Sequence, residues 1–483
     1  MQPPLKVALL LGFAGAAVAV LFIMRSLAPE TPTPETPAPV NSPIVHDRAE
    51  AQREDIAYLS TIAALDRSFS DEQRDALSSD LARLRLRAGE MNDAAFEVGV
   101  AHAMALAGNG HSNAQGVAYG RNLPTLPLRF AWFADGLFVI RAAPVLNCAL
   151  GARLTALNGR SPEDLLQLLR PLIGGTDQFA KLLSVNILVA PAALHELDPN
   201  SPPDSARIAV VQSRCTQSEF NVDATARPSS NSADENRWPT RDLSPVREPA
   251  DQNTFEQALD GKSTSLYLRR PDDPYWSARL GTDLMYVQLR RMRNVGSVTL
   301  PEFAQSTVET VKKQRISHVV VDLRASPGGN SNLLFSFSRQ LPSAVGPHGK
   351  VFVLIGPNTF SAAIITAARL KYYGGARTLL IGEDMADSGR FWSDGGRATL
   401  PNSHIAISYA RYLQDWSNGC SLAQLRVCYW VQYFHGVAVG DLSPTIRLPE
   451  TSAAYFAGRD SVMEKVQELI ASESRDSPTL ALR

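Results

Sequence analysis

One histidine lies among small, turn-forming residues, where an imidazole ring can face a cleft. His111 stands in the stretch GNGHSN at positions 108–113, directly after a helix predicted over 93–107. Histidine is the usual general base near neutral pH, because its ordinary pKa is close to 6.5. A lone histidine in such a loop is also compatible with an ordinary surface residue, so the rest of the sequence has to distinguish the two.

A serine occupies a second position that is suited to chemistry. Ser361 lies in TFSAA at 359–363, between a predicted buried strand ending at Ile355 and a predicted helix over 362–372. The start of a helix carries free N–H groups and the positive end of the helix dipole. A serine there can act as a nucleophile whose oxyanion is stabilised nearby, or it can simply cap the helix.

Two adjacent glycines follow another predicted buried strand. The strand over 319–323 leads into DLRASPGG, which ends at Gly328 and Gly329. Paired glycines allow backbone N–H groups to approach a ligand closely or to adopt positive φ. Two such donors can hold an oxyanion, although an ordinary turn at a strand end has the same composition.

Taken together, these segments resemble the motifs of the tail-specific (C-terminal-processing) and tricorn-core serine peptidases. That family carries, in order, a motif like Asp-x-His-Thr, a strand running Asp-Leu-Arg-x-x-x-Gly-Gly, and Thr-x-Ser-Ala-x. The corresponding segments here are NGHS at 109–112, DLRASPGG at 322–329 and TFSAA at 359–363. IGE at 381–383 also fits the family, and GARLTALNGR at 151–160 is similar to a core element of PDZ-like modules.

The resemblance implies that Ser361 is the nucleophile and leaves two bases to compare. Processing peptidases use a lysine in a Gly-Lys-Gly stretch, but the matching segment 384–390 reads DMADSGR. Lys371 lies about 15 Å from Ser361 along a helix, which is too far for a base. The tricorn-type branch uses histidine with an assisting carboxylate, and His111 fits that role.

The remaining members of the site follow from the same resemblance. N–H groups of Gly328 or Gly329, together with that of Ala362, would form the oxyanion hole. The tricorn-like branch has a glutamate some sixty residues after its serine, where this sequence has no acid nearby. Asp415 and Gln432 are the alternatives, and Gln432 is slightly favoured because it precedes a Gly-Val segment as the family glutamate does. A glutamine would stabilise an imidazolium less well than a carboxylate.

The elements that position these residues are predicted from hydrophobic spacing, which gives a helix over 71–86 and strands over 129–140 and 153–157 before the C-terminal half. From residue 280, buried strands over 285–289, 319–323, 351–355 and 379–381 alternate with helices over 301–314 and 362–372. This alternation predicts an α/β domain with a largely parallel sheet. The resemblance implies a crotonase-like (ClpP/crotonase) core with an inserted small β-rich PDZ-like module and an N-terminal helical segment.

The N-terminus predicts export. Residues 7–24 are uninterruptedly apolar, and at about 1.5 Å per residue they nearly span a hydrocarbon core of about 30 Å. A cleaved signal peptide is the alternative. The predicted order is a membrane anchor or signal segment (1–28), a Pro-rich linker (29–46), an N-terminal helical region (47–110), a β-rich PDZ-like module (111–225), a polar loop or linker (226–275) and a catalytic domain (276–475).

The composition and the cysteines narrow the class of protein further. The 483 residues include 47 basic and 48 acidic ones, a balance that gives no general attraction to nucleic acid. Cys420 with Cys428, and Cys148 with Cys215, are candidate disulfides in an exported protein; four free thiols are the alternative. No His or Cys spacing indicates a zinc site, and no cofactor is expected.

The resulting hypothesis is a membrane-anchored serine endopeptidase whose catalytic part is periplasmic or extracellular and whose substrate is a peptide or protein. The oligomeric state stays open. Two alternatives remain: an inactive peptide-binding or scaffold protein on the same fold, and an acyl-transfer or thioester-hydrolysing enzyme on a crotonase-like core.

Overall fold

The computed structural model describes residues 47–116, 123–225, 243–245, 255–259 and 264–476. The segments predicted as an anchor or signal (1–28) and as a Pro-rich linker (29–46) lie outside these residues. In the part of the chain that is described, no single helix is long and apolar enough to cross a membrane; α6 (Asp177–Ile187) and α7 (Pro191–Leu197) reach that length together but meet at a bend of 119°.

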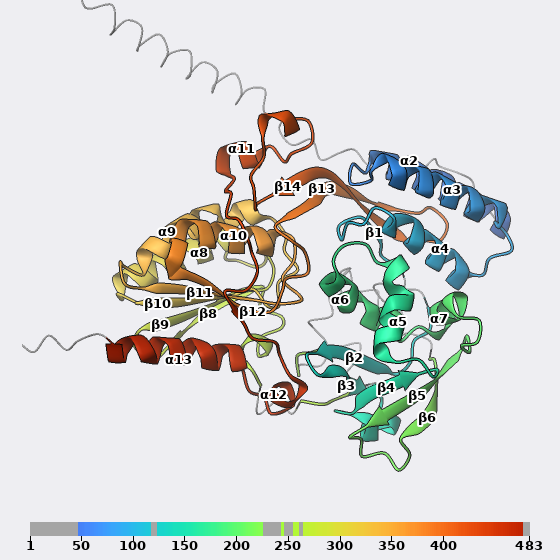
Figure 1. Ribbon diagram of the computed structural model, residues 1–483, viewed down its shortest axis with the longest axis horizontal. Coiled ribbons are helices and arrows are strands. Elements are labelled where there is room, and N and C mark those ends of the chain that lie inside the picture. Colours follow the sequence, from blue (N-terminus) through green and yellow to red (C-terminus); the bar gives the residue numbers. More distant parts are fainter. Residues whose placement is uncertain (1–46, 117–122, 226–242, 246–254, 260–263, 477–483) are drawn as a thin grey trace, which may run out of the picture. The chain divides into compact units, whose positions relative to one another are not determined.

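A largely parallel sheet forms the C-terminal half of the chain, as the sequence predicted (Figure 1). Its strands, in spatial order, are β15 (Ile446–Arg447), β12 (Thr378–Gly382), β11 (Lys350–Ile355), β10 (His318–Asp322), β9 (Leu284–Leu289) and β8 (Tyr275–Leu280). All neighbours are parallel except β8 and β9. Every residue of β10 is buried, which explains why this strand has no polar alternation in the sequence.

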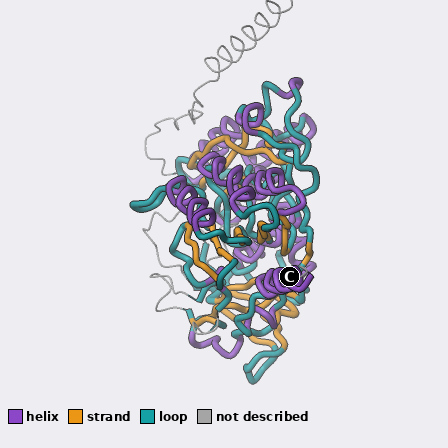
Figure 2. The backbone as a smooth tube through the Cα atoms, turned by 90° about the vertical axis from the view of Figure 1, so that its left-hand side faces the viewer, coloured by secondary structure: helices purple, strands orange, loops and turns teal. Residues whose placement is uncertain are grey.

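Helices cover both faces of this sheet. Helices α8 (Leu300–Lys313), α9 (Phe335–Ala344) and α10 (Ala362–Gly374) share one apolar core with the side chains of one face. Helix α13 (Ser461–Asp476) packs on the other face against Tyr286, Val320 and Phe352. In Figure 2, the mark C lies on the helix that ends the described chain, α13, and several other helices lie above it.

An antiparallel sheet lies in the region predicted as a β-rich module. Its strands run in the order β2 (Leu128–Phe133), β3 (Gly136–Ala142), β4 (Arg153–Leu157), β5 (Ser205–Val211) and β6 (Glu219–Asp223), with β7 (Glu256–Gln257) beside β3. Helices α5 (Pro162–Leu169), α6 and α7 interrupt the sequence of strands between β4 and β5. At the end of the predicted polar loop, Tyr267 and Leu268 are buried rather than exposed.

A third sheet joins the N-terminal helices to the C-terminal half. It consists of β1 (Asn113–Ala114), β14 (Ala406–Asp415) and β13 (Arg390–Thr399), and the long β13–β14 hairpin reaches toward α2 (Arg48–Leu65), α3 (Asp71–Leu86) and α4 (Asp93–Ala105) in Figure 1. Asn113 pairs with Ser408. Because β1 begins two residues after His111, this pairing ties the histidine loop to the half of the chain that carries Ser361.

Both predicted cysteine pairings are present: Cys148 is bonded to Cys215 and Cys420 to Cys428. The two cysteines of the first pair are 67 residues apart in the sequence and those of the second are 8 apart. The first disulfide therefore restricts a much longer segment of the unfolded chain.

Removing the disulfide that closes the longer loop should lower the free energy of unfolding more than removing the other disulfide. We expect the double variant Cys148→Ser/Cys215→Ser to lose about 4 kcal/mol of unfolding free energy, and the matched control Cys420→Ser/Cys428→Ser about 2–3 kcal/mol, because loop-closure entropy grows with loop length. Urea unfolding under non-reducing conditions measures both. A larger loss in the control would contradict this order.

Candidate active site

Ser361 stands at a strained turn between β11 and α10. Its backbone has φ 54° and ψ −122°, a left-handed conformation that is uncommon for a residue with a side chain. Such strain persists only where the surroundings enforce it, and it is typical of functional positions. The side chain makes no capping hydrogen bond, so the helix-cap interpretation of this serine is wrong.

The turn is held by the segment that follows β10. The Thr359 hydroxyl donates to the Leu323 carbonyl at 2.9 Å, and the Phe360 N–H donates to the Ser326 carbonyl at 3.0 Å. These bonds attach the serine turn to the DLRASPGG motif. They also supply the external support that the strained backbone of Ser361 requires.

Gly328 lies directly against the nucleophile turn. Its φ is 101°, and a Cβ atom built there would lie 2.8 Å from the amide nitrogen of Ala362 and 2.9 Å from Cβ of Ser361. Gly329, with φ 135°, is held by the backbone of Met292 through bonds to its two neighbours, Gly328 and Asn330. Among the described residues, the N–H groups of Gly328 and Ala362 have no hydrogen-bond acceptor. The two amides next to Ser361 are thus free to bind a ligand oxygen.

Alanine at position 328 should therefore damage the site. We expect Gly328→Ala to lower peptide turnover at least about 10²-fold, the effect of losing one oxyanion donor, because the added Cβ must push backbone rather than a side chain. Gly346→Ala is the matched control, since Gly346 also has positive φ but no atom within 4 Å of its virtual Cβ. Steady-state kinetics of both variants decide; equal turnover would contradict the expectation.

The His111 side chain lies between two aromatic rings and is only 16% exposed. Its ring stacks on Phe360 at a centroid distance of 4.3 Å and on Phe391 at 5.2 Å. Phe360 is the residue before Ser361, so the tertiary structure brings the predicted base to the predicted nucleophile. Burial lowers the pKa of His111 to about 3, and the imidazole is therefore neutral at pH 7.

The two imidazole nitrogens of His111 are buried without a hydrogen-bond partner, so the ring is not bonded to Ser361 in this state. Hydrogen bonds between catalytic groups are often long or unformed without substrate. Nδ1 lies 3.9 Å from Oδ2 of Asp387, in the loop after β12. Burial raises the pKa of Asp387 to about 7.

The structure places neither Asp415 nor Gln432 against His111. The Asp415 carboxylate pairs with Arg390 at 3.3 Å and accepts the N–H of Asn418 at 2.8 Å. Gln432, in α11 (Val431–His435), is buried, and in the amide orientation that satisfies both its ends it pairs with the backbone N–H and carbonyl of Asp415 at 2.8 and 2.9 Å. Both side chains thus stabilise the end of β14.

Sequence reasoning missed Asp387. It lies in the DMADSGR segment, which lacks a lysine but holds two acids, Asp384 and Asp387. The signal was present: the loops after β10, β11 and β12 begin at the carboxyl ends of three neighbouring parallel strands, where sites in such sheets form. Gly328, Ser361 and Asp387 each lie in one of these loops.

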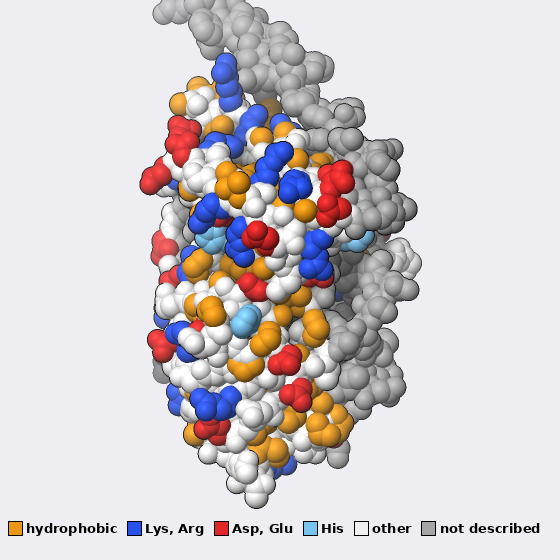
Figure 3. All heavy atoms as spheres, turned by 90° about the vertical axis from the view of Figure 1, so that its right-hand side faces the viewer, with side chains coloured by type: hydrophobic (Ala, Val, Ile, Leu, Met, Phe, Trp, Pro, Cys, Tyr) orange, Lys and Arg blue, Asp and Glu red, His pale blue; other side chains and the backbone are white. Residues whose placement is uncertain are grey.

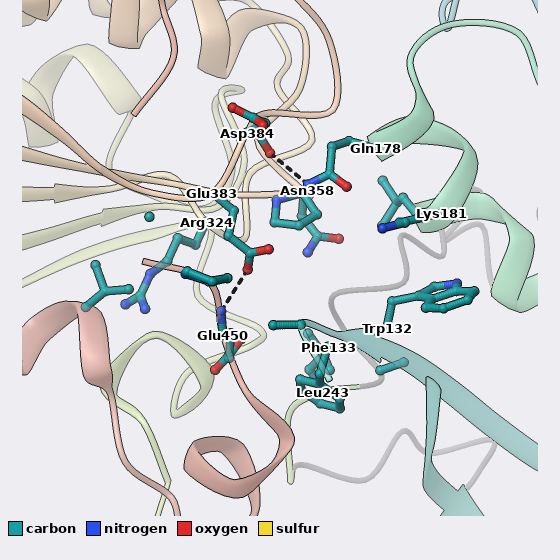
Figure 4. Close-up of a pocket in the computed structure, with 18 of the residues that line it drawn as sticks. Trp132, Phe133, Gln178, Lys181, Leu243, Arg324, Asn358, Glu383, Asp384 and Glu450 are labelled. Atoms are coloured by element: carbon teal, nitrogen blue, oxygen red, sulfur yellow. Dashed lines mark hydrogen bonds between the residues drawn. The ribbon is translucent and has the colours of Figure 1, made fainter. Parts of the chain in front are cut away.

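A cavity of about 460 Å³ lies beside the nucleophile turn, between the antiparallel module and the parallel sheet (Figure 4). Residues 356–358 line it, so it begins within about 11 Å of Ser361, three Cα steps away. Ser361 and His111 themselves do not line it. Trp132 and Lys181 face Glu383 and Glu450 across this space.

Two carboxyl groups of this cavity, those of Glu450 and Glu383, are desolvated. Burial raises the pKa of Glu450 to about 7, and its carboxyl accepts the Tyr267 hydroxyl at 2.9 Å. Burial also raises the pKa of Glu383, which accepts the Glu450 N–H at 3.0 Å. Arg324 is paired with Asp322 and Asp460, so its charge is already compensated. The cavity thus combines an aromatic wall with hydrogen-bonding groups, which suits a peptide segment.

In the described part of the chain, no group of three or more His, Cys, Asp or Glu side chains is arranged to hold a metal ion. On the face shown in Figure 3, basic and acidic side chains are interspersed among hydrophobic ones.

The fold and the site define an α/β protein with a strained serine turn at the carboxyl edge of its parallel sheet and a histidine stacked on the residue before that serine. Its fold is similar to that of mature CPAF, at 13% identity and a TM-score of 0.53, over 90% of this chain and 99% of that one. CPAF complexed with lactacystin matches at 13% identity and a TM-score of 0.53, over 88% and 98%.

The photosystem II D1 C-terminal processing protease is also found among the similar structures, at 12% identity and a TM-score of 0.36, over 82% of this chain and 93% of that one. No protein-family model and no curated protein matches the sequence.

Proposed function

We propose that this chain is a serine peptidase of the tail-specific and tricorn-core kind, with a crotonase-like core that carries Ser361 and a PDZ-like module inserted before it. The observation that carries the proposal is the strained Ser361 turn, packed against Gly328 and next to a buried, neutral His111. The fold shared with CPAF supports it.

In the proposed mechanism, Oγ of Ser361 attacks the scissile carbonyl carbon while His111 accepts the hydroxyl proton. The oxyanion is held by the N–H groups of Gly328 or Gly329 and of Ala362. His111 then donates its proton to the leaving amine, which leaves an acyl-enzyme. Water, deprotonated by His111, hydrolyses that ester and regenerates the serine.

The substrate peptide is placed in the 460 Å³ cavity beside the nucleophile turn. An extended chain advances about 3.3 Å per residue, so side chains two to four residues from the scissile bond reach the space lined by 356–358. The aromatic surface of Trp132 supplies apolar contact, and the cavity's carboxyl groups supply polar contact.

The catalytic part is proposed to be exported and held at a membrane by residues 1–28, with 29–46 as a spacer. The apolar N-terminal run supports this assignment. The two disulfides support it as well, because disulfides persist in oxidising compartments outside the cytosol.

A labelled fluorophosphonate tests the proposal, since it reacts with an activated serine. The full chain in detergent is treated with the probe and assayed in parallel on casein and on a short acyl thioester. Labelling together with casein cleavage supports a peptidase, whereas labelling with thioester turnover alone indicates the acyl-transfer alternative.

An inactive peptide-binding protein on the same fold is the second candidate. The observation that favours it is the missing hydrogen bond between His111 and Ser361. Absence of both labelling and turnover in the correctly folded chain would select this candidate.

A further inference from the structure

The loop after β12 brings a carboxyl group to His111 that the mechanism above does not use. Oδ2 of Asp387 lies 3.9 Å from Nδ1 of His111, and the two side chains are 8% and 16% exposed. Neither of these two atoms has a hydrogen-bond partner. Buried polar atoms are almost always paired, so two facing atoms without partners indicate a hydrogen bond that forms when the site closes slightly.

The backbone around Asp387 is attached to the rest of the site. The Ala386 N–H donates to the Thr359 carbonyl at 3.0 Å, in the nucleophile turn, and its carbonyl accepts the Thr176 hydroxyl at 2.6 Å. The Ser388 N–H donates to Oδ1 of Asp387 at 2.8 Å. That bond orients the carboxyl group and leaves Oδ2 directed at the histidine.

The histidine loop is attached to the same point. A Cβ on Gly175, next to Thr176, would lie 3.0 Å from the amide nitrogen of Gly110, so the two backbones touch. The start of α6 thus contacts both the loop of His111 and the loop of Asp387. A small shift there can close the 3.9 Å gap without moving a whole domain.

We propose that Asp387 is the positioning residue of this site: its carboxylate accepts the Nδ1–H of His111 and so directs Nε2 toward Ser361. The inference rests on the proposed function. An acceptor at Nδ1 selects the tautomer whose Nε2 lone pair is free to take the serine proton. The carboxylate then stabilises the imidazolium that forms, which would otherwise be an unpaired charge in a buried place.

The pair predicts a pH dependence with a definite sign. Asp387 must be ionised and His111 neutral; burial raises the pKa of Asp387 to about 7 and lowers that of His111 to about 3. Turnover should therefore rise with pH through about 7. Among the described residues, His111 is the one titratable group within ion-pair distance of the Asp387 carboxyl, at 3.9 Å.

The test compares Asp387→Asn with the matched control Asp394→Asn in the full chain. Desolvation raises the pKa of Asp394 as well, but the Asp394 carboxyl accepts hydrogen bonds from Ser393 and Gln414. We expect Asp387→Asn to lower kcat by about 10²–10⁴-fold with little change in KM and to abolish the rise near pH 7. Asp394→Asn should keep the wild-type rate and profile, and Asp387→Glu should recover part of the loss.

Stability separates positioning from a merely structural role. A carboxyl group whose pKa is higher in the folded than in the unfolded protein makes the folded protein less stable as the pH rises. Asp387→Asn should therefore unfold at a higher temperature than wild type at pH 8. The two unfolding midpoints should converge toward pH 4. A structural role predicts the opposite sign at pH 8.

A final readout does not depend on activity. In protein with ¹⁵N-labelled histidine, His111 should be protonated at Nδ1 in wild type and should shift toward a mixture of tautomers in Asp387→Asn. An unprotonated Nδ1 in wild type, or equal kcat and pH profile in Asp387→Asn, overturns the inference. If wild type has the Nδ1 proton but neither cleaves peptides nor reacts with fluorophosphonate, the proposed function fails and the positioning contact stands.

Discussion

Ser361→Ala is expected to abolish peptide cleavage and fluorophosphonate labelling, with a loss in kcat of about 10⁶-fold. The reason is that no other group can form the acyl-enzyme at this turn. The fold should survive, because the serine side chain makes no capping bond and alanine meets the same backbone strain at φ 54°. Circular dichroism and the thermal midpoint of the purified variant check that it is folded.

Ser306→Ala serves as the control for this substitution, since Ser306 is exposed on α8, far along the chain from the site. It should leave both labelling and turnover unchanged. Turnover near the wild-type rate in Ser361→Ala would show that the nucleophile lies elsewhere.

His111→Gln is expected to lower turnover nearly as much as Ser361→Ala, because the serine proton then has no acceptor. Glutamine fills part of the space between Phe360 and Phe391. The two residues act as one unit, so the double variant should be hardly worse than either single variant. Single-turnover and steady-state assays of the three proteins measure this non-additivity.

Lys371→Ala distinguishes histidine from lysine as the base. Lys371 lies in the last turn of α10, and its ammonium group donates to the backbone carbonyl of Asp441. Lys371 should therefore be dispensable for turnover. Loss of activity in Lys371→Ala with normal activity in His111→Gln would reverse the assignment of the base.

Local structure was predictable because it depends on near neighbours. The buried strands that became β10 and β11 and the helix that became α10 follow from apolar runs and spacing, and the predicted α3 over 71–86 has the observed bounds. The stretch 129–140, predicted as one strand, is instead the hairpin β2–β3, in which Ala134 and Asp135 form the turn and Phe133 pairs with Gly136, whose φ is 134°. In that case a two-residue turn outweighed strand propensity.

The third member of the site could not be identified from the sequence. Gln432 and Asp415 were chosen by their order along the chain, but order carries no information about which side chains face one ring. The pairing of β1 with β14 and the stacking of Phe391 decide what surrounds His111. Asp387 reaches that place because β12 lies beside β11 in the sheet.

The sequence by itself determined the residue types of the chemistry and the strands and helices that carry them, because turns, caps and burial patterns are set within a few residues. Only the tertiary structure decided the strain at Ser361, the burial that makes His111 neutral, and the carboxylate that faces it. These properties arise from contacts between segments far apart in the chain, and a pKa or a hydrogen bond depends on the atoms that surround a group in space.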